Sequence, residues 1–236
     1  MKVKSICFDL GDTLINSGHP LSWSSNYKKA LGKGFLSINK LSTDYDLNNC
    51  LKILTKYNTR ENPREIEISS DKIFNEIKDI LGINSSKKDT FENEFFEYFL
   101  QSSELYDDVE EVLVDIKNCN IKTGILTDVP YGRKKGFIAD DVEVINKNID
   151  IILSSVDIGF RKPNITGYLI LAEKLETNVN EMIYVGNEEK DIIGANNAGI
   201  VSVLINRTDK RINYGEKYQF KCLKEMWYYI KRQTIA

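Results

Sequence analysis

The chain of 236 residues is 42% hydrophobic and 28% charged, which is the balance of an ordinary folded protein rather than a disordered one. Its 32 basic and 35 acidic residues give a formal net charge of −3, so the charge gives no reason to expect a nucleic-acid partner. No apolar run approaches the roughly 20 residues of a membrane span, and the N-terminus lacks the long apolar region of a signal peptide. We therefore expect a cytoplasmic protein that binds neither nucleic acid nor a membrane. The sequence does not indicate its oligomeric state.

The cysteine and histidine content argues against several kinds of site. The four cysteines are scattered without a CxxC pair, so neither a zinc site nor a disulfide framework is expected. Cys7 and Cys50 lie within apolar patterns, which predicts core positions for both. His19 is the single histidine, so Ser-His-Asp and Cys-His mechanisms are nearly excluded unless His19 is the base.

The first predicted element is a buried strand, because residues 3–8 form a short apolar run with β-branched side chains. Asp9 follows this strand directly, and Gly11, Asp12 and Thr13 come next. Open α/β folds bind their ligands at the carboxyl edge of the parallel sheet, where such a residue would lie. We therefore take Asp9 as the main candidate for a catalytic residue.

The following part of the chain carries helical signals and no strand pattern. Residues 15–41 are polar, are interrupted by glycines and show no clear pattern. Apolar residues at helical spacing predict one helix over 45–57 and another from about Asp71 that ends at Gly82. A third helix has Asp89 as its expected N-cap, and its phenylalanines are expected to pack inward. We predict an all-helical insertion, a cap, over residues 17–101.

From residue 102 onward, predicted helices alternate with short apolar strands. Strands are expected over 121–126, 151–153, 182–185 and 201–205, and helices around 109–116, 165–175 and 191–198. A mixed helix and loop is expected from Tyr131, and a closing helix within 208–236. With the first strand, this gives a parallel sheet of about five strands covered by helices on both faces. The predicted fold class is α/β, with a discontinuous core over residues 1–16 and 102–236.

Polar residues follow four of the predicted strands. They are Asp9 with its neighbours, Thr127 with Asp128, Lys162, and the segment 186–191 that contains Asn187, Glu188 and Asp191. Because the carboxyl ends of parallel strands meet at one edge of the sheet, residues far apart in the sequence can surround one ligand there. A carboxylate, a hydroxyl, an ammonium and a second acidic cluster together suit phosphoryl chemistry.

The charges of these side chains suggest their catalytic roles. Asp9 would attack phosphorus and form an aspartyl-phosphate, which divides one displacement into two steps. Lys162 would offset the negative charge on the nucleophile and on the phosphoryl oxygens. The segment Thr127-Asp128 would form the phosphate-binding loop, with the hydroxyl and backbone N–H groups as donors.

A cation is expected at this site because the attacking carboxylate and the phosphate repel each other. Mg²⁺ suits the role, since it prefers carboxylate, carbonyl and water oxygens. The expected ligands are Asp9, the backbone carbonyl of Gly11, Asn187 and Asp191, with Asp12, Thr13 and Glu188 as further candidate site residues.

These motifs resemble those of the haloacid dehalogenase-like (HAD) hydrolases, specifically the members with a helical cap inserted after the first motif. The similarity covers nearly the whole chain. Residues 8–14 look like motif one, Thr127 like motif two, Lys162-Pro163 like motif three and residues 185–192 like motif four. The resemblance implies a Rossmann-like core, a mobile cap, Mg²⁺ dependence and, most often, hydrolysis of a small phosphorylated substrate.

Two residues depart from the family pattern. Gly11 stands where the family phosphatases usually have a second Asp, which protonates the leaving group and then activates water. Loss of a general acid/base typically costs about 10²- to 10⁴-fold in rate. Asp12 is adjacent, but a neighbouring position in an extended segment points elsewhere. Asn187 stands where the family usually has an acidic metal ligand, although an amide oxygen can still coordinate Mg²⁺.

Three functions stay open at this point. The leading one is phosphomonoester hydrolysis, slow or confined to substrates with good leaving groups. Gly11 is also compatible with a metal-independent 2-haloacid dehalogenase, and the two departures motivate a catalytically weak member that binds a phosphorylated ligand or a protein as a regulator. His19, Trp23, Lys28 and Lys29 are candidates to face the pocket. The sequence does not identify the substrate.

Overall fold

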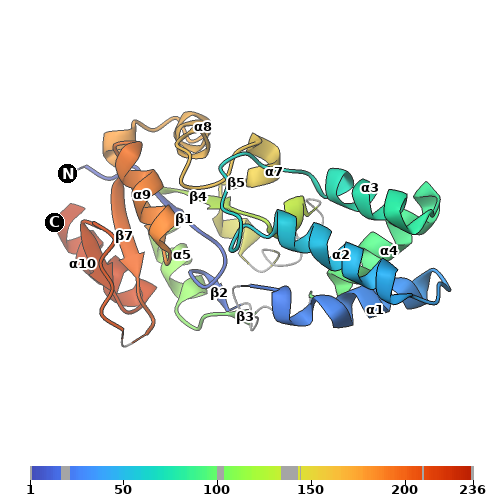
Figure 1. Ribbon diagram of the computed structural model, residues 1–236. Coiled ribbons are helices and arrows are strands. Elements are labelled where there is room, and N and C mark those ends of the chain that lie inside the picture. The colour runs from blue at the N-terminus through green and yellow to red at the C-terminus, as the bar shows by residue number, and fades with distance from the viewer. Residues whose placement is uncertain are drawn as a thin grey trace.

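A six-stranded parallel sheet forms the centre of the α/β part of the chain (Figure 1). The computed structural model describes residues 2–16, 22–99, 104–133, 143, 145–208 and 210–234. The strand order is β5-β4-β1-β6-β7-β8. The strands are β1 Ser5–Phe8, β4 Lys122–Thr127, β5 Ile151–Ser154, β6 Met182–Gly186, β7 Val201–Ile205 and β8 Tyr218–Phe220.

The prediction of about five strands is one short. The additional strand, β8, is three residues long and pairs in parallel with β7 at the edge of the sheet. Its three side chains are only partly buried or exposed, so it lacks the apolar run that reveals the buried strands. The α/β fold class and the parallel arrangement are confirmed.

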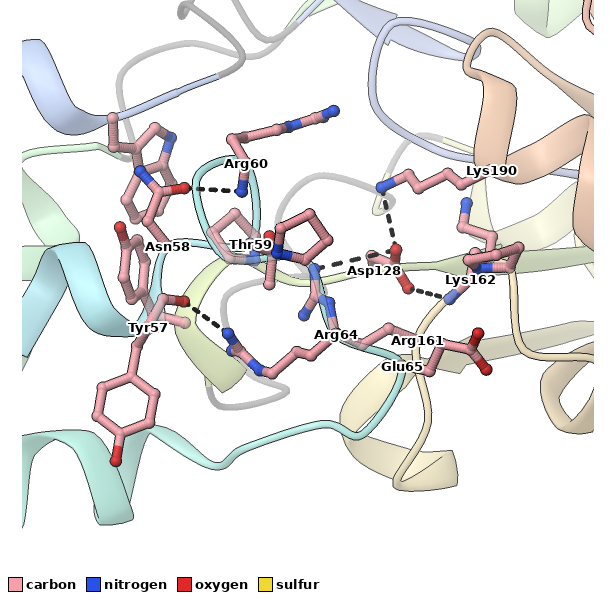
Figure 2. A pocket seen from close by; sticks show the side chains of 15 residues that line it. Tyr57, Asn58, Thr59, Arg60, Arg64, Glu65, Asp128, Arg161, Lys162 and Lys190 are labelled. Atoms are coloured by element: carbon pink, nitrogen blue, oxygen red, sulfur yellow. Dashed lines mark hydrogen bonds and ion pairs between the residues drawn. The ribbon is translucent and has the colours of Figure 1, made fainter.

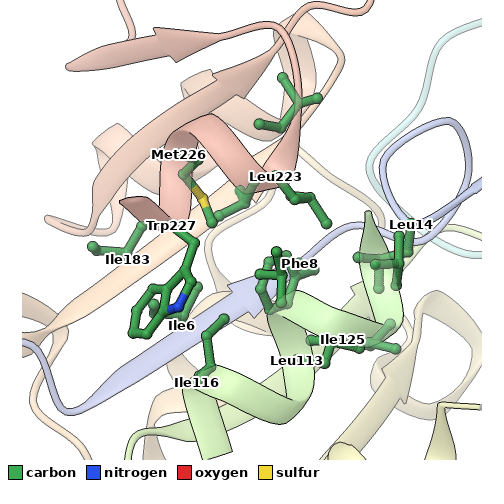
Figure 3. Close-up of a cluster of buried hydrophobic side chains, with 14 of the residues drawn as sticks. Ile6, Phe8, Leu14, Leu113, Ile116, Ile125, Ile183, Leu223, Met226 and Trp227 are labelled. Atoms are coloured by element: carbon green, nitrogen blue, oxygen red, sulfur yellow. The ribbon is translucent and has the colours of Figure 1, made fainter. Parts of the chain in front are cut away.

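Helices cover both faces of the sheet, as the alternating pattern predicts. The helices of the α/β part are α5 Val109–Asn118, α7 Ser155–Ile158, α8 Thr166–Lys174, α9 Glu189–Asn197 and α10 Leu223–Thr234, with the 3₁₀ turns η2 Pro130–Gly132, η3 Asn146–Asn148 and η4 Val179–Glu181. Successive strand residues point to opposite faces. Ile6 and Phe8 accordingly pack with α5 and α10 (Figure 3), whereas Cys7 packs with α8 and α9.

Four helices form a second unit, which we call the helical cap. They are α1 Tyr27–Ser37, α2 Asp44–Tyr57, α3 Ser70–Leu81 and α4 Ser85–Glu97, preceded by the 3₁₀ turn η1 Ser24–Asn26. Their apolar faces bury a hydrophobic cluster separate from those of the sheet. Figure 1 shows the four helices together at the end of the molecule opposite the two termini. The predicted domain boundaries fall on or beside residues 17 and 101, outside the described residues, and stay predictions.

The helical cap differs from the prediction in two of its helices. Helix α1 is not expected from the sequence, because two glycines interrupt its pattern; an added Cβ at Gly34 would come within 2.9 Å of the Phe91 ring, so this glycine lets α1 approach α4 closely. The predicted N-cap at Asp89 is wrong. Helix α4 begins at Ser85, and the Asn84 side chain accepts a hydrogen bond from Lys87 N at 2.9 Å.

Two short strands pair with each other, and one residue of the loop after β4 packs into the helical cap. The short strands β2 Ile15–Asn16 and β3 Glu104–Leu105 pair antiparallel. Tyr131, in the loop after β4, is buried in the hydrophobic cluster of the cap, where its hydroxyl is hydrogen-bonded to the Tyr27 hydroxyl. In the part of the chain that the structure describes, no helix is long and apolar enough to cross a membrane.

Candidate active site

Asp9, Lys162 and Asp191 lie together at the carboxyl edge of the sheet. Asp9 follows the central strand β1, and Asp191 lies in the first turn of α9, which follows the neighbouring strand β6. The Lys162 ammonium donates to Asp9 Oδ1 at 2.5 Å and lies 2.7 Å from Asp191 Oδ1. All three side chains are almost completely buried. One cation therefore stands between two carboxylates that would otherwise repel each other.

Lys162 is held in place by contacts at both ends. Its backbone N–H donates to Asp128 Oδ1 at 3.1 Å, which fixes the loop between α7 and α8. Its ammonium also lies 3.3 Å from Leu126 O and from the Tyr184 hydroxyl. Burial disfavours the ammonium, but the charges of Asp191 and Asp9 outweigh it and raise the pKa of Lys162 well above its ordinary value. The lysine is therefore a permanent cation.

The environment of Asp9 opposes full ionisation of its carboxyl group. Burial raises the pKa of Asp9 to about 7; Lys162 lowers it and Asp191 raises it further. A carboxylate in such a site is weakly solvated and lies beside a fixed positive charge. Both properties suit a group that must attack an electrophile.

The loop after β6 is shaped around Asp191. Asp191 Oδ2 accepts hydrogen bonds from the backbone N–H groups of Asn187 at 3.1 Å and Glu188 at 3.0 Å. Gly186 makes this possible, because an added Cβ there would overlap the Asp191 side chain. Asn187 Oδ1 accepts a hydrogen bond from the Thr13 hydroxyl at 3.1 Å, which connects this loop to the loop after β1.

Thr127 and Asp128 lie at the same edge, at the end of the neighbouring strand β4. Thr127 is the last residue of β4 and is buried. Asp128 Oδ2 pairs with Lys190 Nζ at 3.0 Å. Burial works against ionised Asp128, but Lys190, Arg161 and Lys162 outweigh it and hold its pKa well below the usual range. Asp128 is therefore an anion that holds cations at the site, so we expect it to act on a phosphate through them.

Three other predicted site residues have distinct surroundings. Glu188 pairs with Arg60 at 2.6 Å and with Lys190 at 3.0 Å, so its carboxylate is engaged by two cations. Asp12 has a left-handed backbone with φ of 56°, and its charge acts on the Tyr106 hydroxyl. Gly11 has open space on the side where a side chain would stand, since an added Cβ would meet no atom within 4 Å.

The donor set at this edge fits Mg²⁺. Asp191 Oδ1 is buried and makes no hydrogen bond to any described residue, although it is paired with the Lys162 ammonium. The Asp9 carboxylate, the Asn187 amide oxygen and the Gly11 carbonyl belong to the neighbouring loops. No group of three His, Cys, Asp or Glu suited to a metal occurs in the described ranges. Mg²⁺ does not require one, because it keeps several waters and takes few protein carboxylates.

A cavity of about 390 Å³ opens between the helical cap and the core (Figure 2), and of Asp9, Lys162 and Asp191 it is Lys162 that lines it. Core residues Asp128, Arg161, Lys162 and Lys190 line one side, and the segment 57–65 of the helical cap lines the other. Of the predicted pocket residues, Trp23 lines the cavity, whereas Lys28 and Lys29 are exposed and do not. His19 lies outside the described residues.

Several residues of the site are not expected from the sequence. Lys190, which pairs with Asp128, lies inside the predicted fourth motif but is given no role by the sequence. Tyr184, whose hydroxyl donates to Leu126 O, is part of an apolar strand and gives no sign of a polar contact. Arg60 and Glu67 belong to the helical cap and reach residues more than 90 positions away, Glu188 and Arg161. Local spacing gives no signal for such contacts, because they depend on how two parts of the chain dock.

The chain is a capped α/β protein with a polar site at the carboxyl edge of its sheet. The site is a buried lysine between two carboxylates. The model of the family described as haloacid dehalogenase-like hydrolase matches residues 36–205, and the chain belongs to that family of hydrolases. The matched residues include Thr127, Lys162 and Asp191 and begin after Asp9.

Similar proteins include both phosphatases and dehalogenases. A phosphoglycolate phosphatase from Vibrio parahaemolyticus is 25% identical over 203 residues, covering 85% of this chain and 82% of that one. The structure of a HAD phosphatase from Thermococcus onnurineus has a TM-score of 0.67 at 20% identity, covering 97% and 98% of the two chains. That of a 2-haloacid dehalogenase from Pseudomonas syringae pv. Tomato has a TM-score of 0.71 at 18% identity, covering 98% and 100%. At these identities the two structures show the shared fold.

Proposed function

We propose that this hydrolase cleaves small phosphomonoesters through an aspartyl-phosphate on Asp9. The observation that carries the proposal is the position of the Asp9 carboxylate, buried at the carboxyl edge of the sheet with the Lys162 ammonium 2.5 Å from Oδ1. The similarity to a phosphoglycolate phosphatase supports the same reaction.

The reaction takes place in two displacements at phosphorus. A carboxylate oxygen of Asp9 attacks phosphorus, and the bond between phosphorus and the ester oxygen breaks. Because Gly11 has no side chain to donate a proton, the departing oxygen takes its proton from water. A water molecule then attacks the phosphorus of the aspartyl-phosphate, and the bond between phosphorus and the Asp9 oxygen breaks. The hydroxide left by the first step takes the proton that this water loses, so inorganic phosphate is released and the carboxylate is restored. Substrates whose leaving groups need little protonation should therefore react fastest.

The protein contributes fixed charges to both displacements. Lys162 stays beside the attacking carboxylate, and Lys190 stays beside Asp128 at the rim of the cavity. Preorganised charges of this kind stabilise developing negative charge without reorganising during the reaction. Asp9, Asn187, Asp191 and the Gly11 carbonyl are the residues that would hold Mg²⁺. When bound, the ion neutralises the repulsion between Asp9 and a phosphate.

The cavity favours a small substrate that enters between the helical cap and the core. Its volume of about 390 Å³ lies at the lower end of typical ligand sites. Five of the lining residues are cations, Arg60, Arg64, Arg161, Lys162 and Lys190, which suits an anion. Phosphoglycolate is the first compound to assay, because a relative bears that name. A cytoplasmic location stays a prediction.

The test is a panel of phosphomonoesters with and without Mg²⁺, using wild-type protein and Asp9→Asn. We expect turnover that requires the metal in the wild type and none in Asp9→Asn, with an acid-stable radiolabel transferred from a ³²P-labelled substrate only to the wild type. No turnover of any ester by the wild type would contradict the proposal. Halide release from 2-haloacids without a metal would instead indicate a dehalogenase.

A second function, regulation by a catalytically weak member, is favoured by one observation. Gly11 leaves open space where a general acid would be expected, so the site can bind a phosphate more readily than it can turn an ester over. Tight binding of a phosphorylated ligand with no measurable hydrolysis would support that function.

A further inference from the structure

Glu67 is a carboxylate of the helical cap that lies buried against the core, beside the loop that carries Lys162. Its side chain is 3% exposed and belongs to the segment between α2 and α3. The backbone of this segment pairs with the core: Glu67 N donates to Gly159 O at 2.9 Å, and Arg161 N donates to Glu65 O at 2.7 Å. The Glu67 carboxylate, a charged group of the cap, therefore lies within the core.

Both oxygens of the Glu67 carboxylate are engaged. Oε2 accepts hydrogen bonds from Arg161 Nη1 and from the Ser155 hydroxyl, each at 2.5 Å. Oε1 accepts a hydrogen bond from Ile68 N at 2.8 Å. Arg161 and Ser155 are themselves buried core residues. A buried carboxylate with this many partners is a fixed element of the structure rather than a solvated surface charge.

The two core partners of Glu67 both hold the loop after β4. Arg161 Nη1 donates to Val129 O at 2.8 Å, and the Ser155 hydroxyl accepts from Val129 N at 3.1 Å. Val129 directly follows Asp128, whose carboxylate accepts the Lys162 N–H at 3.1 Å. Glu67 is therefore two hydrogen bonds away from the loop expected to receive the phosphoryl group.

Arg161 contacts two carboxylates, that of Glu67 and that of Asp128. Arg161 Nη2 lies 3.9 Å from Asp128 Oδ2, whereas Lys190 lies 3.0 Å from the same oxygen. With Glu67 neutralised, Arg161 would lose its closer carboxylate partner and keep Asp128, which Lys190 and the Lys162 N–H also contact.

We propose that Glu67 is a positioning residue that acts through Arg161 to hold the Asp128–Val129 loop and the Lys162 loop in their phosphate-receiving arrangement. The inference rests on the proposed phosphatase function. If Glu67 has this role, the site is complete only when the 65–67 segment of the helical cap is docked on the core.

The first test compares Glu67→Gln with Glu92→Gln. Each change removes one carboxylate charge from a nearly fully buried side chain of the cap, but Glu92 lies in α4 near Lys88 and does not line the cavity. The readouts are kcat and KM for p-nitrophenyl phosphate and the inhibition constant of inorganic phosphate. Because small misplacements of a reacting group are costly, we expect Glu67→Gln to lower kcat/KM by about 10- to 100-fold and to weaken phosphate inhibition. Glu92→Gln should change either quantity by less than about twofold, even where it lowers the melting temperature.

The second test repeats Glu67→Gln in an Arg161→Gln background. If Glu67 acts through Arg161, its substitution should change the phosphate inhibition constant by less than about twofold there. This inference alone is overturned if Glu67→Gln has its full effect in the Arg161→Gln background. It is also overturned if the wild type is active and Glu67→Gln changes the kinetics no more than Glu92→Gln does. Failure of the wild type to hydrolyse any ester overturns the proposed function and this inference with it. Should Glu67→Gln not fold, Arg161→Gln alone still tests the link, because it removes the donor that joins Glu67 to Val129 O. It should weaken phosphate inhibition by about tenfold, and no change in that variant would overturn the proposal.

Discussion

Lys162 and Asp9 are 153 positions apart in the chain, yet the lysine ammonium lies 2.5 Å from Asp9 Oδ1. The same ammonium lies 2.7 Å from Asp191 Oδ1. The three groups are buried, so water contributes little to screening their charges. This single cation therefore stabilises the folded site as well as serving the proposed chemistry.

Replacement of Lys162 should lower the free energy of unfolding at neutral pH. Lys162→Met leaves Asp9 and Asp191 without their cation, and removal of one partner from a buried ion pair costs about 3–5 kcal/mol. The deficit should shrink as the pH is lowered, because protonation of Asp9, whose pKa burial already raises to about 7, removes one of the two neighbouring charges. Urea unfolding at several pH values measures both effects.

Two further variants make the lysine experiment decisive. Adding Asp191→Asn to Lys162→Met removes one of the stranded charges and should recover part of the lost stability. Lys231→Met removes a half-exposed partner of Asp115 instead, and its effect should be much smaller. Equal losses in Lys162→Met and Lys231→Met would contradict the role given to the buried cluster.

Restoring a carboxyl group after the nucleophile should increase phosphatase activity. An added Cβ at Gly11 meets no atom within 4 Å, so the position has room for the first atom of a side chain. If only a proton donor is lacking, kcat for substrates with poor leaving groups should rise by up to about 10²- to 10⁴-fold. Rates with alkyl and nitrophenyl esters measure the gain, which should be larger for the alkyl esters.

The same substitution elsewhere provides the control for Gly11→Asp. Gly32 in α1 also has open space around its Cβ position, and Gly32→Asp should leave the rates unchanged. A rise of similar size in both variants, or none in Gly11→Asp, would argue that proton donation does not limit the reaction.

A side chain at Gly186 should disturb Asp191 and hence the whole cluster. The added methyl of Gly186→Ala would overlap the Asp191 side chain, which has backbone hydrogen bonds to Asn187 and Glu188 to lose. Overpacking at a buried site typically costs about 1–3 kcal/mol. We expect that loss in thermal or urea unfolding together with reduced activity. Gly11→Ala, where space is available, should show neither loss of stability nor displacement of Asp191, and equal stability of the two variants would contradict the expectation.

Asp128 should contribute a pH-dependent share of the stability. Its pKa in the folded protein is held well below the ordinary value of about 3.9 by Lys190, Arg161 and Lys162 after the opposing effect of burial. The stabilisation is therefore complete above about pH 4 and is lost as the pH falls from there toward the lower folded-state pKa. Asp128→Asn keeps an oxygen for the Lys162 N–H but loses the charge. The free energy of unfolding of the two proteins should differ most at neutral pH and converge in acid; a constant difference would contradict this.

The elements that a short sequence window can reveal are those with a pronounced apolar pattern. The buried strand before Asp9 and the helix from Asp71 are examples, and the rule that parallel strands share a carboxyl edge predicts from the sequence alone that Asp9, Lys162 and Asp191 lie together. Helix α1 is missed because Gly34, which its packing against Phe91 requires, weakens the helical pattern. Strand β8 is missed because it is short and only partly buried.

The contacts of the site are less predictable than its principal residues. The link from Glu67 to Arg161 depends on backbone pairing between residues 65–67 and 159–161, which neither segment encodes by itself. Asp128 appears in the sequence as part of a phosphate-binding loop, and only its partners identify it as the holder of Lys190 and the Lys162 loop. Pairings of this kind are a product of docking, so a single sequence without related sequences carries no trace of them.

Tyr131 has a consequence for any attempt to exchange caps between related proteins. Its ring completes the hydrophobic cluster of the helical cap although it comes from the loop after β4. A chimera that exchanges the cap helices alone would place Tyr131 against the hydrophobic cluster of a different protein's cap. That cap would also lack the residue that fills this position in its own protein. Successful grafts should therefore transfer residues 130–132 together with the helices.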